Sequence, residues 1–130
     1  MSKARVLIVD DEADLRKSVR LTLTKGGYEV VEAEDGGKGI EALRSGDNPL
    51  MVDAVICDLM MPNVNGMEAI AYFRSQFPGV PVLVLTGQVK VDNLNELYQQ
   101  GVVDYLVKPI APEKLLAAVE KAVSKRKLFD

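Results

Sequence analysis

The residues best suited to chemistry are aspartates that follow short apolar runs. Asp58 ends the run Val-Ile-Cys and precedes Leu-Met-Met-Pro, and Asp10 and Asp11 follow the run Arg5–Val9. Packing does not explain a carboxylate at the end of a strand rich in valine and isoleucine. A carboxylate presented where a loop begins can instead attack phosphorus as a nucleophile and form an acyl phosphate. We therefore predict that Asp58 accepts phosphate and that the rest of the chain serves it.

Two further apolar runs also end in polar residues, namely Thr86 and Lys108. Phosphoryl transfer requires neutralisation of charge on the equatorial oxygens and in-line positioning of the reacting groups. Lys108 offers a movable positive charge, and the Thr86 hydroxyl offers a hydrogen-bond donor. These two side chains are the predicted catalytic partners of Asp58.

The aspartates also predict a bound cation. Three carboxylates close together repel one another, so one must be protonated or a cation must lie among them. Mg²⁺ favours oxygen ligands and needs only one or two carboxylates together with phosphate oxygens and water. The absence of histidine disfavours zinc and copper. We expect Asp11 and Asp58 to bind Mg²⁺ directly, with the Met60 carbonyl as a further candidate and Asp10 acting through water.

The elements that position these side chains alternate along the chain. Strand-length apolar segments occupy Arg5–Asp10, Tyr28–Ala33, Val52–Asp58, Val80–Thr86 and Val102–Val107. Helical spacing follows each one, carried by Leu15/Val19/Leu23, Ile40/Leu43, Ile70/Phe73/Phe77, Val91/Leu94/Leu97 and Leu115/Val119/Ala122. Such alternation predicts a parallel sheet covered on both faces. We expect an α/β, flavodoxin-like three-layer sandwich with strand order 2-1-3-4-5, with Tyr28–Ala33 at an edge because it carries two glutamates. Ser45–Pro49 is predicted to be a loop.

In such a sheet the carboxyl ends of the strands share one edge, and ligands bind where the strand order reverses. For the order 2-1-3-4-5 that point lies between the first and third strands, which carry the three aspartates.

Composition restricts the function further. The chain has 130 residues, of which 48% are apolar and 27% are charged, and this predicts one domain spanning residues 1–130. The net charge of −3 argues against nucleic-acid binding, and no apolar run reaches the roughly 18 residues that a membrane span needs. A single cysteine, Cys57, favours a reducing cytoplasm and reads as a small buried hydrophobe. Without histidine, any phosphohistidine must belong to a partner.

From about Lys3 to Ala122 the sequence resembles the receiver domain of bacterial two-component response regulators. The motifs that carry the resemblance are Val-Asp10-Asp11-Glu12, Asp58-Leu-Met-Met-Pro62, Asn65-Gly66, Leu-Thr86-Gly87, Asp104-Tyr105-Leu and Lys108-Pro109-Ile. The resemblance implies that Asp58 takes a phosphoryl group, with Mg²⁺ bound, from a phosphohistidine on a sensor histidine kinase or a histidine phosphotransfer protein. It further implies that Thr86 and Tyr105 form a switch and that the Lys108–Pro109 peptide is cis.

The expected protein is therefore a signalling switch that promotes only its own phosphorylation and dephosphorylation. Phosphorylation is expected to change the face formed by the helix with Leu94 and Leu97, the strand Val102–Val107 and the helix after Pro112. An unknown output domain or protein would recognise that face. The chain is expected to be a monomer or a phosphorylation-dependent homodimer.

Other interpretations fit the residues less well. Asp10 and Asp11 could simply cap the following helix, but Asp58 and Lys108 complete a site. An aspartyl phosphatase would carry a second aspartate at the position of Met60. A flavin- or nucleotide-binding module would need a phosphate loop where Asp10-Asp11-Glu12 stands. Within the resemblance, Gly39 and Gly87 stand where alanine is common, Val102 stands where alanine often follows the glycine, and the segment before the third strand is slightly long.

Overall fold

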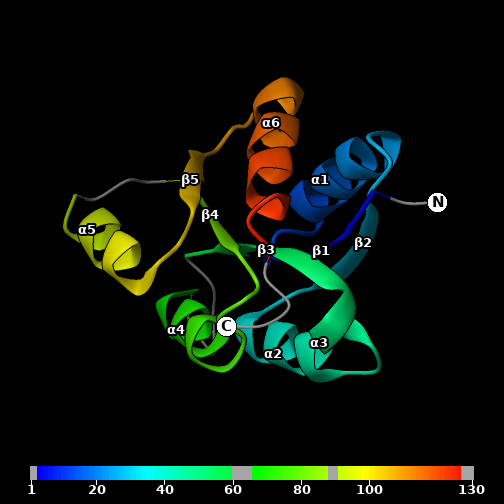
Figure 1. The fold of residues 1–130 in the computed structure, drawn as a ribbon. Coiled ribbons are helices and arrows are strands. Elements are labelled where there is room, and N and C mark those ends of the chain that lie inside the picture. Colours follow the sequence, from blue (N-terminus) through cyan, green and yellow to red (C-terminus); the bar gives the residue numbers. More distant parts are fainter. Residues whose placement is uncertain (1–2, 60–65, 88–90, 127–130) are drawn as a thin grey trace.

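The computed structural model describes residues 3–59, 66–87 and 91–126, and only the backbone of residues 91–93. Within these ranges, strands and helices alternate (Figure 1). The strands are β1 (Arg5–Val9), β2 (Glu29–Ala33), β3 (Val52–Asp58), β4 (Val82–Thr86) and β5 (Asp104–Val107). The helices are α1 (Ala13–Lys25), α2 (Gly36–Arg44), α3 (Asn48–Met51), α4 (Gly66–Gln76), α5 (Val91–Gln100) and α6 (Pro112–Val123).

The strands form one parallel sheet in the order β2-β1-β3-β4-β5, which confirms the predicted fold class and order. β2 lies at an edge, as its glutamates predicted, and its Glu29 is exposed. In Figure 1, α1 and α6 lie together on one face of the sheet, and α2 and α4 lie on the other. The molecule therefore has three layers.

Alternate residues of each inner strand face two separate cores. In β1, Leu7 and Val9 join the core under α2 and α4, whereas Val6 and Ile8 join the core under α1 and α6. Each such buried side chain stabilises the fold by roughly 1.5–3 kcal/mol. Because both faces are covered, the inner strands consist mostly of apolar residues, with Asp53 as an exception inside β3, and their register is strongly fixed.

The helices turn the predicted faces toward these cores. Leu115, Val119 and Ala122 of α6 are buried, as their spacing predicted. Phe73 of α4 is the largest side chain that is completely buried among the described residues. No helix in the described ranges is both long and apolar enough to cross a membrane.

The segment before β3 differs from the prediction. The expected loop Ser45–Pro49 runs instead into the short helix α3, so six helices rather than five occur in the described residues. Arg126 fixes this helix, since its guanidinium donates to the carbonyls of Pro49 and Leu50 and to that of Val52. A helix of four residues has no apolar periodicity of its own, which is why sequence spacing did not reveal it.

Candidate functional site

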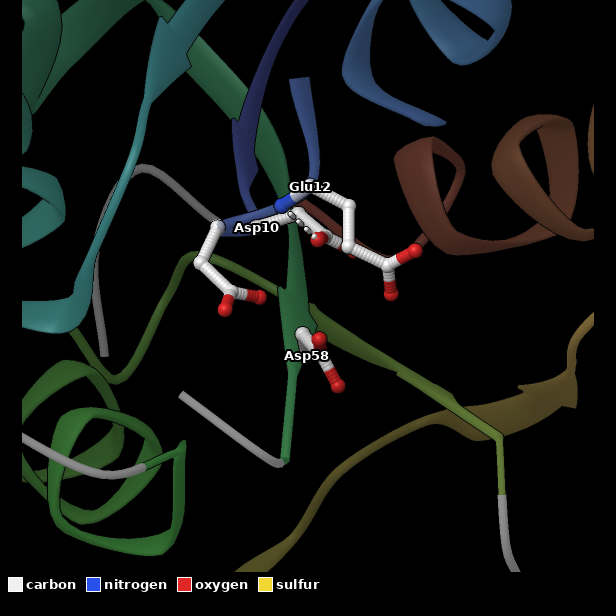
Figure 2. A group of neighbouring side chains, drawn as sticks. Asp10, Glu12 and Asp58 are labelled. Carbon is white, nitrogen blue, oxygen red and sulfur yellow. Dashed lines mark hydrogen bonds between the residues drawn. The ribbon is translucent and has the colours of Figure 1, made fainter. Parts of the chain in front are cut away.

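The register of the sheet brings Asp10 and Asp58 to neighbouring strand ends. Val9 of β1 pairs with Cys57 of β3, and the two aspartates follow directly. The Asp10 side chain is completely buried and that of Asp58 is 3% exposed. Figure 2 shows how these two carboxylates and Glu12 gather at the carboxyl edge of the sheet. The predicted meeting of the first and third strands is thus present.

Lys108 reaches the same place from the end of β5. Its Nζ lies 3.1 Å from Asp10 Oδ2, 3.1 Å from Asp58 Oδ2 and 2.8 Å from Glu12 Oε1. The peptide bond between Lys108 and Pro109 is cis, as the family resemblance implied. The Lys108 backbone N–H donates to the Thr86 carbonyl at 2.8 Å, which ties this residue to the end of β4. The ammonium group is therefore enclosed by three carboxylates.

Four acidic side chains make up the carboxylate cluster. Asp10, Asp11, Glu12 and Asp58 each place one carboxylate oxygen within 4.8 Å of the others. Asp10 and Asp58 are buried, whereas Asp11 and Glu12 are exposed. The ammonium of Lys108 offsets only part of this negative charge, and hard oxygen donors of this kind suit Mg²⁺.

The buried carboxylate of Asp10 gives a more specific test of whether the site suits a cation. Its Oδ1 accepts a hydrogen bond from the Glu12 backbone N–H at 2.8 Å, drawn as a dashed line in Figure 2. Its Oδ2 is buried and accepts no hydrogen bond from any described residue, although the Lys108 ammonium lies nearby. An oxygen of this kind can interact with a metal or a metal-bound water. The residues present therefore fit a divalent cation.

Burial and charge shift the ionisation of this group of residues. Burial raises the pKa of Asp10, and the neighbouring charge of Asp58 adds to the effect, against the Glu12 hydrogen bond and the Lys108 ammonium. For Lys108, burial acts to lower the pKa, but Glu12, Asp10 and Asp58 together raise it above its ordinary value. Lys108 is consequently held in its charged form.

The two predicted switch residues lie on adjacent strands. Thr86, the last residue of β4, is buried. Tyr105 of β5 is half-buried and packs partly against the core under α2 and α4. Its ring meets that of Tyr98 edge to face, with ring centroids 6.4 Å apart. Tyr105 also lines a hollow together with Val107 of β5 and Lys114 of α6.

Glycines allow the backbone to pass close behind the site. A Cβ at Gly66 would lie 2.2 Å from the Asp58 carbonyl oxygen and 2.4 Å from Leu59 Cα. The Gly66 N–H donates to the Leu59 carbonyl at 3.1 Å, which brings the start of α4 back to the end of β3. At Gly39 a Cβ would lie 2.8 Å from Val9 Cγ2. These close approaches account for glycine at both positions.

The structure brings together Asp10, Asp11, Asp58 and Lys108 as the sequence predicted, with Thr86 bonded through its carbonyl to Lys108. Met60, the candidate carbonyl ligand, lies outside the described residues. Cys57 is buried in the core, and burial raises the pKa of its thiol. The sequence prediction omitted Glu12, although the run of three acidic residues after β1 could have indicated it.

Comparison with known families agrees with this arrangement. The model of the response regulator receiver domain matches residues 6–120. The chain belongs to the response regulator receiver domain family. Receiver domains act as signalling switches in two-component systems and are not classical enzymes.

Curated relatives carry this receiver domain as one part of a longer chain. Response regulator MprA of Mycobacterium ulcerans is 39% identical over 126 residues, which are 97% of this chain and 53% of MprA. Transcriptional regulatory protein GlrR of Escherichia coli is 38% identical over 120 residues, covering 92% of this chain and 26% of GlrR. The chain thus spans about half of the one relative and about a quarter of the other.

Solved structures share the whole fold of the receiver domain. Chemotaxis protein CheY4 of Vibrio cholerae superposes with a TM-score of 0.83 at 34% identity, covering 92% of this chain and 98% of CheY4. A receiver domain protein of Clostridium thermocellum gives a TM-score of 0.86 at 29% identity, with coverage of 94% and 95%. The similarity therefore extends over nearly the entire chain.

Proposed function

We propose that this receiver domain is switched by transfer of a phosphoryl group to Asp58 from a phosphohistidine on a sensor histidine kinase or a histidine phosphotransfer protein. The observation that carries the proposal is the position of the Asp58 carboxylate at the carboxyl edge of the sheet, 3.1 Å from the Lys108 ammonium and within the carboxylate cluster. A nucleophile, a cation and a set of metal-binding oxygens at one point suit phosphoryl transfer.

In the proposed reaction an Asp58 oxygen bonds to phosphorus while the bond between phosphorus and the histidine nitrogen breaks, and the electron pair of that bond stays on the imidazole. Lys108 pairs with a phosphoryl oxygen, and the Thr86 hydroxyl donates a hydrogen bond to another. Asp11 and Asp58 would hold Mg²⁺, with Asp10 acting through water and the Met60 carbonyl as a further ligand. When bound, the ion supplies positive charge that offsets the charge of the phosphoryl oxygens.

The proposed switch follows from the same contacts. If Thr86 turns toward the phosphoryl group, it vacates space into which Tyr105 can turn. The affected face carries a hollow of about 400 Å³, which is lined in part by Tyr105, Val107 and Ile110. The change is a shift between two populations, and its size is limited by how differently they bind the phosphoryl group.

The same proposal covers the extent of the domain, its location, its output partner and its oligomeric state. Residues 1–130 would act as one cytoplasmic receiver domain that promotes only its own phosphorylation and dephosphorylation. An output domain or protein would bind the face formed by α5, β5 and α6, and the chain would be a monomer or form a homodimer on phosphorylation. Light scattering with and without beryllium fluoride and Mg²⁺, which together mimic the aspartyl phosphate, measures that assembly.

The decisive experiment is labelling by acetyl phosphate or by a phosphorylated kinase. Asp58→Asn should abolish the label because the amide is not a nucleophile toward phosphorus. Asp53→Asn is the matched control, since Asp53 lies at the opposite end of the same strand and should leave labelling intact. Undiminished labelling of the Asp58→Asn protein would reject Asp58 as the acceptor.

A further inference from the structure

The Glu12 side chain makes an unusual contact for a glutamate that precedes a helix. It is the N-cap residue of α1, where a side chain commonly accepts a hydrogen bond from the first turn. The Glu12 side chain makes no such bond. It accepts a hydrogen bond from Lys108 Nζ at 2.8 Å instead, across 96 positions of sequence. Helix capping therefore does not account for this side chain.

The three carboxylates around Lys108 are not equivalent. The side chains of Asp10 and Asp58 are 0% and 3% exposed, whereas that of Glu12 is 61% exposed. Glu12 nevertheless makes the shortest of the three contacts. Exposed ion pairs contribute little to stability, so Glu12 is the partner that Lys108 can release at the smallest cost.

A phosphoryl oxygen that approaches Lys108 enters a crowded negative environment. The ammonium donates to Glu12 Oε1 and to Asp58 Oδ2, and Asp10 Oδ2 lies 3.1 Å from Nζ without accepting a hydrogen bond. These three carboxylates repel a further anion, which therefore approaches more closely when one of them moves away. Asp10 and Asp58 are fixed by burial at the strand ends, which leaves Glu12.

We propose that Glu12 is the resting partner of Lys108, a positioning residue that holds the ammonium beside Asp58 and is displaced when a phosphoryl group arrives. This proposal rests on the proposed function of Asp58. It assigns Glu12 a role distinct from metal binding, because its contact is with the cation that the phosphoryl oxygen must recruit. Loss of Glu12 should therefore favour the phosphorylated form.

The test compares Glu12→Gln, which keeps the length of the side chain and removes its charge, with Glu12→Asp, which keeps the charge and shortens the reach. Asp14→Asn is the control, since it removes an exposed charge from the first turn of α1 outside the cluster. NMR titration with beryllium fluoride at saturating Mg²⁺ gives the affinity for the phosphoryl mimic. The ¹⁵N shift of Lys108 Nζ reports the contact itself, and a separate Mg²⁺ titration reports metal binding.

Glu12→Gln should shift the Lys108 Nζ signal and tighten binding of beryllium fluoride by roughly two- to fivefold, the factor that an exposed ion pair is worth. Glu12→Asp should tighten binding less, and Asp14→Asn should change neither signal nor affinity. Unchanged or weaker binding in Glu12→Gln would overturn the proposal, as would a loss of Mg²⁺ affinity beyond about tenfold, which would show that Glu12 supports metal binding directly or through another ligand. If the wild-type protein neither becomes labelled nor binds beryllium fluoride, the proposed function itself is rejected. If the wild-type protein does both and Glu12→Gln leaves the beryllium fluoride affinity unchanged, only the role of Glu12 is rejected.

Discussion

Lys108 Nζ lies 3.1 Å from Asp58 Oδ2, although fifty positions separate the two residues in the chain. The ammonium therefore forms ion pairs with the same carboxylates that would bind a divalent cation. The carboxylates raise the pKa of Lys108 despite its burial, so the lysine stays charged at neutral and mildly alkaline pH. Lys108 and Mg²⁺ are thus expected to oppose each other in binding while they cooperate in phosphoryl transfer.

Replacing Lys108 with methionine should separate these two effects. Mg²⁺ affinity should rise roughly tenfold, because a unit charge at this range is worth about 1–4 kcal/mol. Labelling of Asp58 should nevertheless slow, since the phosphoryl oxygens lose their cation. Calorimetric Mg²⁺ titration and the rate of labelling measure the two changes. Lys114→Met, on the exposed first turn of α6, is the control. Weaker Mg²⁺ binding by the Lys108→Met protein would contradict this account.

Replacing Asp10 with asparagine should stabilise the protein when no divalent cation is present. The pKa of Asp10 is raised from its ordinary value of 3.8, chiefly by burial, so the folded state binds this proton more tightly than the unfolded chain does. The penalty of ionised Asp10 therefore develops as the pH rises above about 3.8 and is complete above the raised pKa. We expect a gain on the order of 1 kcal/mol at pH 7 that disappears in acid, measured by urea unfolding at both pH values.

Addition of Mg²⁺ should make the wild-type protein more stable than the Asp10→Asn protein, since a ligand that binds the folded state stabilises it. Asp14→Asn should show no comparable gain. An Asp10→Asn protein that is less stable than wild type at pH 7 would mean that the attraction to Lys108 outweighs the burial of the carboxylate.

Two glycines near the site should respond in opposite ways to alanine. At Gly66 the new methyl group would meet the backbone of Asp58 and Leu59, which cannot move aside, and a loss of about 1–3 kcal/mol is expected. At Gly87 a Cβ has no described atom within 4 Å and φ is not in the left-handed region. Gly87→Ala should therefore stabilise the fold by about 0.4–1 kcal/mol. Thermal unfolding of both variants measures the difference, and equal effects would refute it.

Arg126 should prove important for the segment before β3. Its guanidinium donates to the carbonyls of Pro49, Leu50 and Val52, so Arg126→Gln should cost about 1–3 kcal/mol. Amide exchange should accelerate in α3 more than in β1. Lys125→Gln, one position earlier and exposed, is the control. Unchanged exchange in α3 would show that other contacts hold it.

The strands could be predicted from sequence because each inner strand is buried on both faces and consists largely of an apolar run, which Asp53 interrupts in β3. The sequence predicts that β4 and β5 begin at Val80 and Val102, two residues before their observed starts. Pro81 and Val103 do bond to neighbouring strands there, Pro81 through its carbonyl to the Val55 N–H and Val103 through its N–H to the Val82 carbonyl. They contribute single bonds before regular pairing begins, and hydrophobicity alone cannot separate the two situations.

The meeting of Asp10, Asp58 and Lys108 was predictable because parallel topology puts these strand ends on one edge. Glu12 was missed because an exposed glutamate before a helix is usually explained by the start of that helix. Its partner, moreover, lies in an element far away in the sequence. The cis peptide before Pro109 followed only from the family resemblance, since few X–Pro bonds are cis. The contact of Tyr98 with Tyr105 depends on how α5 sits beside β5, which local sequence does not specify.

The pairing of Val9 with Cys57 means that Asp10 and Asp58 are separated by the distance between two neighbouring strands, not by the path of any loop. Insertions or substitutions in the loops can therefore change what covers the site, or how quickly it reacts, while the two carboxylates keep their spacing. A one-residue deletion within β3 would do the reverse, because it would put Leu59 at the edge and direct Asp58 into the core position of Cys57. The rate of the proposed phosphoryl transfer can thus vary independently of the geometry on which it depends.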